Sequence, residues 1–353
     1  MELPSPLCLA FYVIFFVVPL VMMIINRVVV LYKIKIYTQS FSYLFFSKDM
    51  KWPTEPCAGA AFDKALAAAT GKVERKTFIL LRHGESTWNE TFNRGFAPAS
   101  FIPRALHAIL TETYLFLAGV KDSWFYDSPL TNEGIEQAEE FRTFLKASKG
   151  AASQEGEKLV PVMRGDDPSK CLLVSSNLRR ALSTAAVALY DRLEANEEKL
   201  RVTSLLQEIS RNPDTLCITP PKEEPVPSWI ERAYKPLDIK KIYSKHTDMR
   251  DNAGNKPVSS RGITRIKEFV AWAFKEAGSA EHVVVSGHSL YFRHMFRTFL
   301  PSSSTSKGKT NKIHNGGAVA FTLERVPCKE GGINGFAYRM DPDSIVEVYR
   351  GFA

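Results

Sequence analysis

Cysteine is scarce in this chain, and the motifs that the chain lacks exclude several classes of protein. Its 353 residues include five cysteines, which lie far apart with no C-x-x-C spacing. An odd, scattered set fits neither a disulfide framework nor a structural zinc site, and it favours a reducing compartment. The sequence also has no Walker A motif, no G-x-G-x-x-G after a strand and no H-E-x-x-H. We therefore expect no nucleotide-binding loop, no cofactor and no metal ion.

The basic residues do not indicate a nucleic-acid partner. The net charge is +8, but the lysines and arginines are scattered, and no zinc-finger, homeodomain or aromatic RNA-binding signature accompanies them. A solvated basic surface, or one suited to anionic small molecules, is the better interpretation. A hydrophobic content of 45% predicts a sizeable core in one large or two ordinary domains.

The longest apolar run lies near the N-terminus, from Leu7 to Ile25, and contains no charged residue. At about 1.5 Å per residue, this helix would cross most of the hydrocarbon core of a bilayer. A cleaved signal peptide is the main alternative, but such peptides have a basic start and a shorter apolar core, and only Glu2 precedes this run. A buried globular helix is the other alternative, although the segment is apolar all round. We expect a single transmembrane helix.

The flanking charges predict the orientation of this span. Arg27, Lys33 and Lys35 follow it, whereas only the terminal amine precedes it, so the rest of the chain should face the cytosol. The N-x-T acceptor "NET" at Asn89 agrees with this, because on the cytosolic side it never meets the glycosylation machinery.

The composition predicts three segments. A membrane anchor covers residues 1–37, a linker covers 38–75, and a folded domain covers 76–353. The linker contains a weak Ala-rich helical pattern, "AGAAFDKALAAATGK". No internal repeat or long low-complexity tract divides the folded domain further.

Short β-rich runs alternate with helical patterns in the folded domain. The predicted strands are "KTFILL", "CLLVSS", "HVVVSG" and "GAVAFTL", and helical patterns follow Thr131 and the second and third of these runs. Strands separated by helix-length segments favour right-handed crossovers and a mostly parallel sheet. We expect an α/β fold, a three-layer αβα arrangement with a doubly wound sheet, after the N-terminal transmembrane helix.

Polar or charged side chains lie at the ends of three of the predicted strands. The residues at these ends are Arg82, His83 and Gly84 after the first strand, Ser175, Ser176 and then Arg180 after the second, and Ser286, Gly287 and His288 after the third. In open parallel sheets, ligands bind at the carboxyl ends of strands, so these groups should converge. Arginines, histidines and helix N-termini together form a site for a dianion such as a phosphoryl group.

Five motifs in this order resemble the histidine phosphatase superfamily, also called the phosphoglycerate mutase-like family. They are "LRHGESTWN" at 81–89, "DSPLTNEGIEQA" at 127–138, "SSNLRRALSTA" at 175–185, "LLQEIS" at 205–210 and "VVVSGHSL" at 283–290. The resemblance covers residues 76–325 and implies that 76–353 is a catalytic domain. An isolated R-H-G tripeptide is a weak signal, but the ordered set is a strong one.

The resemblance assigns a role to each residue. It implies that His83 is a nucleophile that becomes phosphorylated, and a backbone carbonyl can hold its other ring nitrogen and select the tautomer. Arg82, Arg180 and the catalytic His288 would clamp the phosphoryl oxygens. Taken singly, each of these side chains has an ordinary structural explanation, such as a solvated arginine or a helix cap.

The leaving alkoxide needs a proton, and the resemblance implies that Glu208 supplies it. Glu85 is the rival candidate, and a surface ion pair is the structural alternative for both glutamates. Asn89 and Ser86 are expected to bind substrate in a second tier of the site. Asn315 either reaches the site or belongs to a simple Asn-Gly turn.

The family contains mutases and phosphatases, and the sequence favours a phosphatase. After the candidate acid, the chain reads "EISRNPDTLCITPPKEEPVPSWIERAY", which departs from the mutase pattern. We expect a membrane-anchored hydrolase of a phosphorylated small molecule, lipid or phosphoprotein. Phosphoglycerate mutase-type transfer is one alternative, and a non-catalytic, membrane-tethered scaffold is the other.

Two insertions should influence the choice of substrate. Residues 91–126 place Leu106, Ile109, Leu110, Tyr114 and Leu117 at helical spacing, which predicts a lid, a helix that touches the bilayer, or a helix packed on the core. The second insertion, 211–258, should lie over the same edge of the sheet. A basic loop with Lys307, Lys309 and Lys312 either meets a second anionic group or is solvated.

Overall fold

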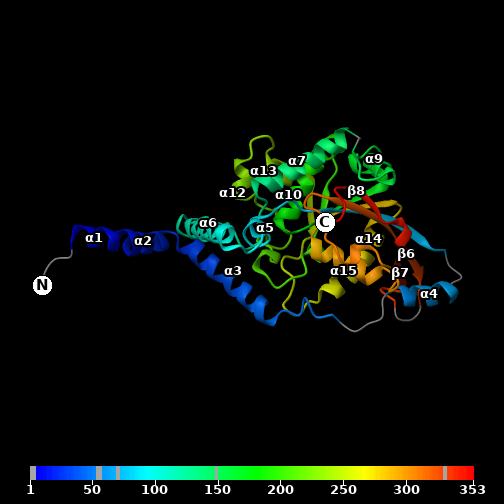
Figure 1. Ribbon diagram of the computed structural model, residues 1–353, viewed down its shortest axis with the longest axis horizontal. Helices are drawn as coiled ribbons and strands as arrows, with labels where there is room; N and C mark the ends of the chain where they lie inside the picture. Colours follow the sequence, from blue (N-terminus) through cyan, green and yellow to red (C-terminus); the bar gives the residue numbers. More distant parts are fainter. Residues whose placement is uncertain (1–4, 53–57, 69–71, 148–149, 329–331) are drawn as a thin grey trace.

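A computed structural model describes residues 5–52, 58–68, 72–147, 150–328 and 332–353 of the chain. Figure 1 shows a folded body from which the N-terminal helices α1 and α2 project. The helices of the body surround one central sheet. The fold therefore consists of a layered body with an N-terminal extension.

The sheet of the described residues has eight strands in the order β4-β3-β2-β5-β1-β6-β7, and β8 also pairs with β6. Strands β4 to β1 of this order pair in parallel, whereas β6, β7 and β8 are antiparallel. The strands are β1 (Glu74–Arg82), β2 (Cys171–Ser176), β3 (Leu200–Thr203), β4 (Thr247–Asp251), β5 (His282–Gly287), β6 (Ala318–Pro327), β7 (Phe336–Met340) and β8 (Val346–Tyr349).

Helices cover both faces of the sheet (Figure 1). The helices of the body and extension are α1 (Pro6–Tyr12), the π-helical η1 (Val13–Val17), α2 (Val18–Ile25), α3 (Arg27–Phe46), α4 (Ala58–Ala68), α5 (Thr87–Phe92), α6 (Pro98–Leu117), α7 (Asn132–Ala147), α8 (Gln154–Glu157), α9 (Val160–Arg164), α10 (Arg179–Ala188), α11 (Tyr190–Asn196), α12 (Trp229–Ala233), α13 (Ile239–His246), α14 (Gly262–Ala277) and α15 (Ser289–Phe299). Short 3₁₀ turns are η2 (Pro168–Lys170), η3 (Ser204–Leu206), η4 (Pro213–Thr215), η5 (Lys307–Lys309) and η6 (Pro342–Ser344).

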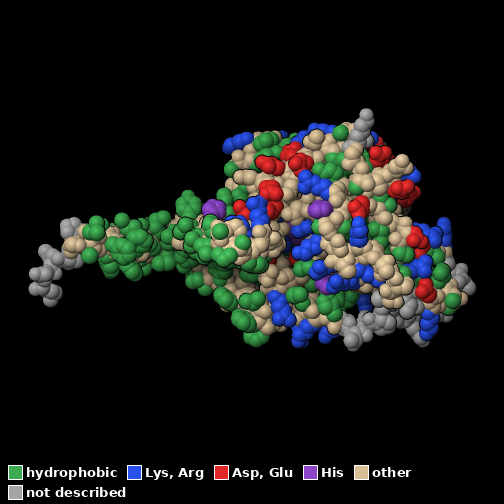
Figure 2. Space-filling view, viewed as in Figure 1, with side chains coloured by type: hydrophobic (Ala, Val, Ile, Leu, Met, Phe, Trp, Pro, Cys, Tyr) green, Lys and Arg blue, Asp and Glu red, His purple; other side chains and the backbone are tan. Residues whose placement is uncertain are grey.

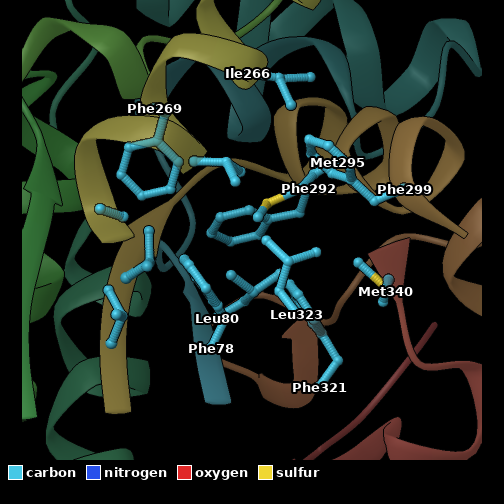
Figure 3. Packing of buried hydrophobic residues seen from close by; sticks show 14 of the residues in the cluster. Phe78, Leu80, Ile266, Phe269, Phe292, Met295, Phe299, Phe321, Leu323 and Met340 are labelled. Carbon is cyan, nitrogen blue, oxygen red and sulfur yellow. The ribbon is translucent and has the colours of Figure 1, made fainter. Parts of the chain in front are cut away.

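Strand β1 divides the core into two halves because its side chains alternate between the faces of the sheet. Phe78 and Leu80 pack with residues of α14 and α15, including Phe269 and Phe292 (Figure 3). Ile79 and its neighbour Leu81 pack on the opposite face against α7, α10 and α13. The predicted α/β fold with three layers and a mostly parallel sheet is confirmed.

The four predicted strands correspond to β1, β2, β5 and β6, and the helices predicted after them are α7, α10 with α11, and α15. Sequence reasoning missed β3, β4, β7 and β8. Strand β3 has only four residues, and β4 (Thr247–Asp251) is a polar edge strand with no buried side chain. Neither a short run nor a polar one shows the alternation that identifies a strand.

The N-terminal extension contains one helix that is long and apolar enough to cross a membrane, Leu7–Ile25, and its side chains are not buried. After Asn26, helix α3 packs on the folded body, where Ile36 and Tyr43 join a small core with Tyr126 and Leu216. The expected division between residues 37 and 38 therefore falls inside a single helix. Lys33, which was expected to flank the span, is fully buried and is not available to lipid headgroups.

The expected linker also contributes to the body. Its Ala-rich stretch forms α4, where Phe62 is buried against Val326 and Ala337 of the sheet edge. Asp49, which follows α3, is buried as well. Residues 53–57 and 69–71 of the expected linker lie outside the described residues.

Candidate active site

The strand ends that the sequence singled out lie side by side. Strand β5 lies between β2 and β1, and the register pairs Arg82 with Gly287 and Ser175 with Ser286. The residues that follow these strands are therefore brought to one edge of the sheet. The predicted convergence is confirmed, although the residues come from three separate parts of the chain.

His83 is held in one tautomer. Its Nδ1 lies 2.6 Å from the carbonyl oxygen of Gly84, which can only accept, so Nδ1 carries the proton. Its Nε2 then has a lone pair and accepts from the Nε of Arg180 at 3.2 Å. The unprotonated ring nitrogen thus faces a guanidinium.

His83 and the three groups of the expected clamp are almost completely buried. Arg82, His83, Arg180 and His288 are between 0% and 8% exposed. Burial, with the nearby guanidinium groups of Arg180 and Arg82, lowers the pKa of His83 well below its ordinary value. Burial also lowers the pKa of Arg82, to about 10. His83 is therefore neutral across the physiological range.

His288 lies opposite His83, with ring centroids 5.2 Å apart. Its Nε2 is 2.9 Å from the hydroxyl oxygen of Ser176 at the end of β2, and its Nδ1 has no hydrogen-bond partner in the described part of the chain. Burial and the positive charge of Arg180 lower the pKa of His288 well below its ordinary value. Arg82 donates from Nη1 to the carbonyl of Ile313, and none of the described residues is a partner for its Nε. Each of these side chains has one unsatisfied polar atom.

Two glycines explain why the first two motifs lie together. A Cβ on Gly84 would lie 2.3 Å from the carbonyl oxygen of Gly134, and a Cβ on Gly134 would lie 2.0 Å from that of Glu85. Any side chain at either position would therefore push α7 away from the loop after β1. The Gly84 amide also donates to Thr184 Oγ1 of α10 at 3.0 Å. The loop that carries His83 is thus clamped between two helices.

Glu208 reaches the site, but its carboxylate is well satisfied. Its Oε1 accepts from the amides of Ile209 at 2.9 Å and Tyr291 at 2.8 Å, and Oε2 accepts from Leu290 at 3.3 Å. Two of these donors belong to the N-terminus of α15, directly after His288. These hydrogen bonds tie the Glu208 carboxylate to the first turn of α15, so Glu208 anchors that helix.

Glu85 is paired, as its structural alternative predicted. Arg94 donates to both of its oxygens, from Nε at 2.7 Å and from Nη2 at 2.5 Å, and Thr131 donates at 3.1 Å. Ser86 caps α5 by accepting from the Asn89 amide at 3.3 Å. The Asn89 side chain in turn accepts from Asn93. Hydrogen bonds thus direct Ser86 and Asn89 toward α5, and substrate binding by these two residues stays a prediction.

Asp214 belongs to the site and was missed by sequence reasoning. It lies in the second insertion, and its Oδ2 is 3.2 Å from Nη2 of Arg180, which also donates from Nη1 to the Asp214 carbonyl at 2.6 Å. Its Oδ1 is buried without a partner. Burial raises the pKa of Asp214 to about 6, against the opposing effect of Arg180. No motif in the sequence marks this residue, because only the fold of the insertion brings it to Arg180.

A second layer supports the segment that carries Glu208. Lys256 donates to the Glu208 carbonyl, to the Ser210 carbonyl at 3.3 Å and to Asp49 at 2.8 Å. Arg265 donates to the other oxygen of Asp49 at 2.7 Å and to the Gln207 carbonyl at 2.6 Å. Asp49 therefore ties the segment after α3 to the loop of the candidate acid.

Among the residues that the structure describes, no group of three or more His, Cys, Asp and Glu side chains is placed to hold a metal ion. Two arginines, two helix N-termini and neutral imidazoles provide the electrostatic environment instead. The expectation that the chemistry needs no metal or other cofactor stays a prediction.

No family model and no curated protein matches the chain. Solved structures with a similar arrangement include one described as mycobacterial hydrolase 1, with 16% identity, a TM-score of 0.36 and coverage of 79% of this chain and all of that one. A mycobacterial glucosyl-3-phosphoglycerate phosphatase matches with 15% identity and a TM-score of 0.34, over 76% of this chain and 98% of the other. A phosphoserine phosphatase mutant from Entamoeba histolytica, in complex with phosphoserine, matches with 16% identity and a TM-score of 0.31, over 70% and 90% of the two chains. These likenesses are too distant to decide the activity, which rests on the site.

Proposed function

We propose that the chain is a phosphomonoester hydrolase of the histidine phosphatase superfamily that acts through a phosphohistidine. The observation that carries this proposal is the tautomer of His83, whose protonated Nδ1 faces a carbonyl while Nε2 faces Arg180. A neutral imidazole oriented in this way can attack an anion that the guanidinium groups hold.

In the first step, Nε2 of His83 forms a bond to phosphorus and the ester P–O bond breaks. The leaving alkoxide takes a proton from a carboxyl group, for which Glu208 and Asp214 are the candidates. In the second step, water attacks phosphorus, its proton passes to the same carboxylate, and the P–N bond breaks to release phosphate and neutral His83. Arg82, Arg180 and His288 bind the phosphoryl oxygens in both steps.

The raised pKa and the free oxygen of Asp214 suit a proton donor better than the hydrogen-bonded carboxylate of Glu208 does. Its raised pKa leaves part of the carboxyl protonated near neutral pH, and its free Oδ1 has no competing hydrogen bond. The Asp214 carboxylate also contacts the guanidinium of Arg180, where we propose that a phosphoryl oxygen of the substrate binds. The substrate would therefore replace Asp214 at the guanidinium of Arg180. The carboxyl group of Asp214 would then lie beside the leaving group.

Phosphoryl transfer of the mutase type is a weaker alternative, and so is a binding module without turnover. The mutase pattern after Glu208 is absent from the sequence, and the residues there form the loop that carries Asp214. Retention of the whole set of Arg82, His83, Arg180 and His288 favours turnover over binding alone.

Membrane attachment is part of the proposal. The apolar helix Leu7–Ile25 supports one span, and the exposed Arg27 and Lys35 that follow it support a cytosolic position for the catalytic domain. Protease added to sealed vesicles with the cytosolic face outward should digest the domain. Protection, or a glycan removed by Asn89→Gln, would contradict this orientation.

The test of the chemistry is to trap the intermediate on the full-length protein. After rapid quenching, radiolabelled substrate should leave a base-stable, acid-labile phosphate on His83. A panel of sugar, lipid and amino-acid phosphomonoesters would then define the substrate by phosphate release. Phosphate release at the normal rate by a folded His83→Asn protein would contradict the mechanism.

A further inference from the structure

Helices α3 and α6 form a pair at the root of the N-terminal extension (Figure 1). The side-chain amide of Asn26, between α2 and α3, donates to the carbonyl of Leu117 at the end of α6 at 2.8 Å. The pair is therefore joined to the apolar helix Leu7–Ile25 at the point where that helix ends.

The inner seam of this pair is polar and charged. Lys33 of α3 forms an ion pair with Glu112 of α6 at 2.7 Å and also donates to the Asp122 carbonyl, and its side chain is fully buried. Glu112 further accepts from the hydroxyl of Tyr37 and from the Trp124 amide at 2.6 Å. The charges of Lys33 and Glu112 are thus turned inward and neutralise each other.

The outer faces of the pair are apolar. On α3, the side chains that are more than half exposed include Val28, Leu31, Ile34, Phe41 and Phe45. On α6, they include Ile102, Leu106, Ile109, Leu110 and Tyr114. Figure 2 shows that this apolar surface continues from the N-terminal helix onto both α3 and α6. We call these ten residues the outer apolar face.

This arrangement is the reverse of a helix pair in water. A surface helix of a soluble protein turns its apolar stripe inward and its charges outward, and a contiguous exposed apolar patch is costly at about 25 cal/mol per Å². In lipid, ionisable side chains instead face the interior of a bundle and pair there, as Lys33 and Glu112 do.

Two further observations identify lipid as the occupant. The outer apolar face is continuous with a helix that has the length and composition of a membrane span. The exposed positions of α3 carry two cations, Arg27 and Lys35, and no carboxylate, while those of α6 carry no Asp, Glu, Lys or Arg. Cations beside an apolar face suit an anionic headgroup layer.

We infer that the outer apolar face of α3 and α6 inserts into the lipid bilayer and seats the catalytic domain on the membrane surface. This inference rests on the membrane attachment in the proposed function and not on the phosphatase chemistry. Helix α6 packs on α5, which begins four residues after His83. The surface that meets lipid is therefore connected through α5 to the loop that carries the proposed nucleophile. The span alone would leave the domain free to tumble, whereas the seated pair orients it.

The test uses the full-length protein in vesicles of phosphatidylcholine and an anionic phospholipid, with p-benzoylphenylalanine as a photoreactive probe. The probe replaces one residue at a time: Leu110 on α6, Phe45 on α3, Phe15 in the span as the positive control, and Leu66 on α4 at the far end of the molecule as the matched exposed control. We expect irradiation to attach phospholipid to the probes at Leu110, Phe45 and Phe15 several-fold more than to that at Leu66.

Each other outcome overturns the inference in a distinct way. Lipid attachment only at Phe15 would leave the span intact and place the outer apolar face outside the bilayer. Cross-links from Leu110 or Phe45 to a second copy of the chain would assign that face to self-association. Lipid attachment at none of the four positions would contradict membrane attachment itself, and phosphate release from the same preparation would show whether the phosphatase proposal survives.

Discussion

Two of the regions that bury charged side chains, the strand-end site and the seam between α3 and α6, treat those charges differently. In the seam, Lys33 has a carboxylate, Glu112, and a carbonyl as partners. In the site, Arg82 donates to a carbonyl, and polar atoms of Arg82, Asp214 and His288 have no partner among the residues that the structure describes. Satisfied charges stabilise a fixed contact, whereas unsatisfied ones in a native protein mark a place with another role.

Neighbouring residues show the same contrast within one helix. Arg179 is paired with Asp122 at 2.7 Å and Asp127 at 3.7 Å, and these carboxylates raise its pKa despite its burial. Arg180, the next residue, contacts His83 and Asp214 instead. Arg179 therefore holds α10 in place, whereas Arg180 is the residue that we propose binds the phosphoryl group.

The largest effect should follow His83→Asn, which removes the nucleophile from the site. Phosphate release should fall by on the order of 10⁴ to 10⁶, as when a hydrolase loses its nucleophile. Steady-state hydrolysis measures the loss, and an unchanged thermal transition shows that the fold is retained. His282→Asn, at the other end of β5, is the matched control and should remain near wild type.

Substitution of the two candidate acids should reduce activity by about 10² to 10⁴, the usual contribution of general acid catalysis. If Asp214 donates the proton, Asp214→Asn should lose far less with an aryl phosphate whose leaving group needs no protonation than with an alkyl phosphate. Glu208→Gln should then reduce both substrates alike, because it loosens the N-terminus of α15. The reverse pattern would assign the proton to Glu208.

In the seam, Lys33→Met should lower the free energy of unfolding by about 3 to 5 kcal/mol, because it leaves the Glu112 carboxylate buried without its cation. The double variant Lys33→Met with Glu112→Gln should recover most of this loss. Chemical denaturation in detergent measures both. Lys35 lies two residues further along α3 and is exposed, so Lys35→Met should change stability by less than about 0.5 kcal/mol. Equal losses at Lys33 and Lys35 would contradict the inward orientation of the charge.

The smallest effect is on pH dependence. The proton donor must be protonated, so activity that depends on Asp214 should fall about tenfold per pH unit above about 6, its raised pKa. Below pH 6, activity should stay level, since the pKa of His83 lies well below its ordinary value. A loss of activity as the pH is lowered below 6, while the substrate stays ionised, would contradict a neutral His83.

Stability should respond to the same group with a definite sign. The pKa of Asp214 is raised in the folded protein, so the folded state binds its proton more tightly than the unfolded state does. Stability from this group is therefore present below its unfolded value and is lost as pH rises to about 6. Asp214→Asn should remove that slope from the unfolding free energy measured between about pH 4 and 7.

Much of the body could be predicted because its signals are local. The buried runs that became β1, β2, β5 and β6 are strongly apolar, and glycines such as Gly84 stand where a side chain has no room. The strands that were missed are short or polar. At the site, the motif residues could be named from sequence, but their partners could not, because Asp214 reaches Arg180 only through the path of a long insertion.

The sequence by itself determined the four strongly apolar strands and the helices that follow them, the apolar helix at the N-terminus and the residue types at the strand ends, since each depends on neighbours within a few positions. Only the tertiary structure decided which nitrogen of His83 is free, which carboxyl faces Arg180 and which way Lys33 points. These depend on contacts between segments far apart in the chain, whose geometry no local pattern encodes. In α3 the apolar and basic residues could be seen in the sequence, but the inward turn of Lys33 is set by its partner Glu112 on another helix.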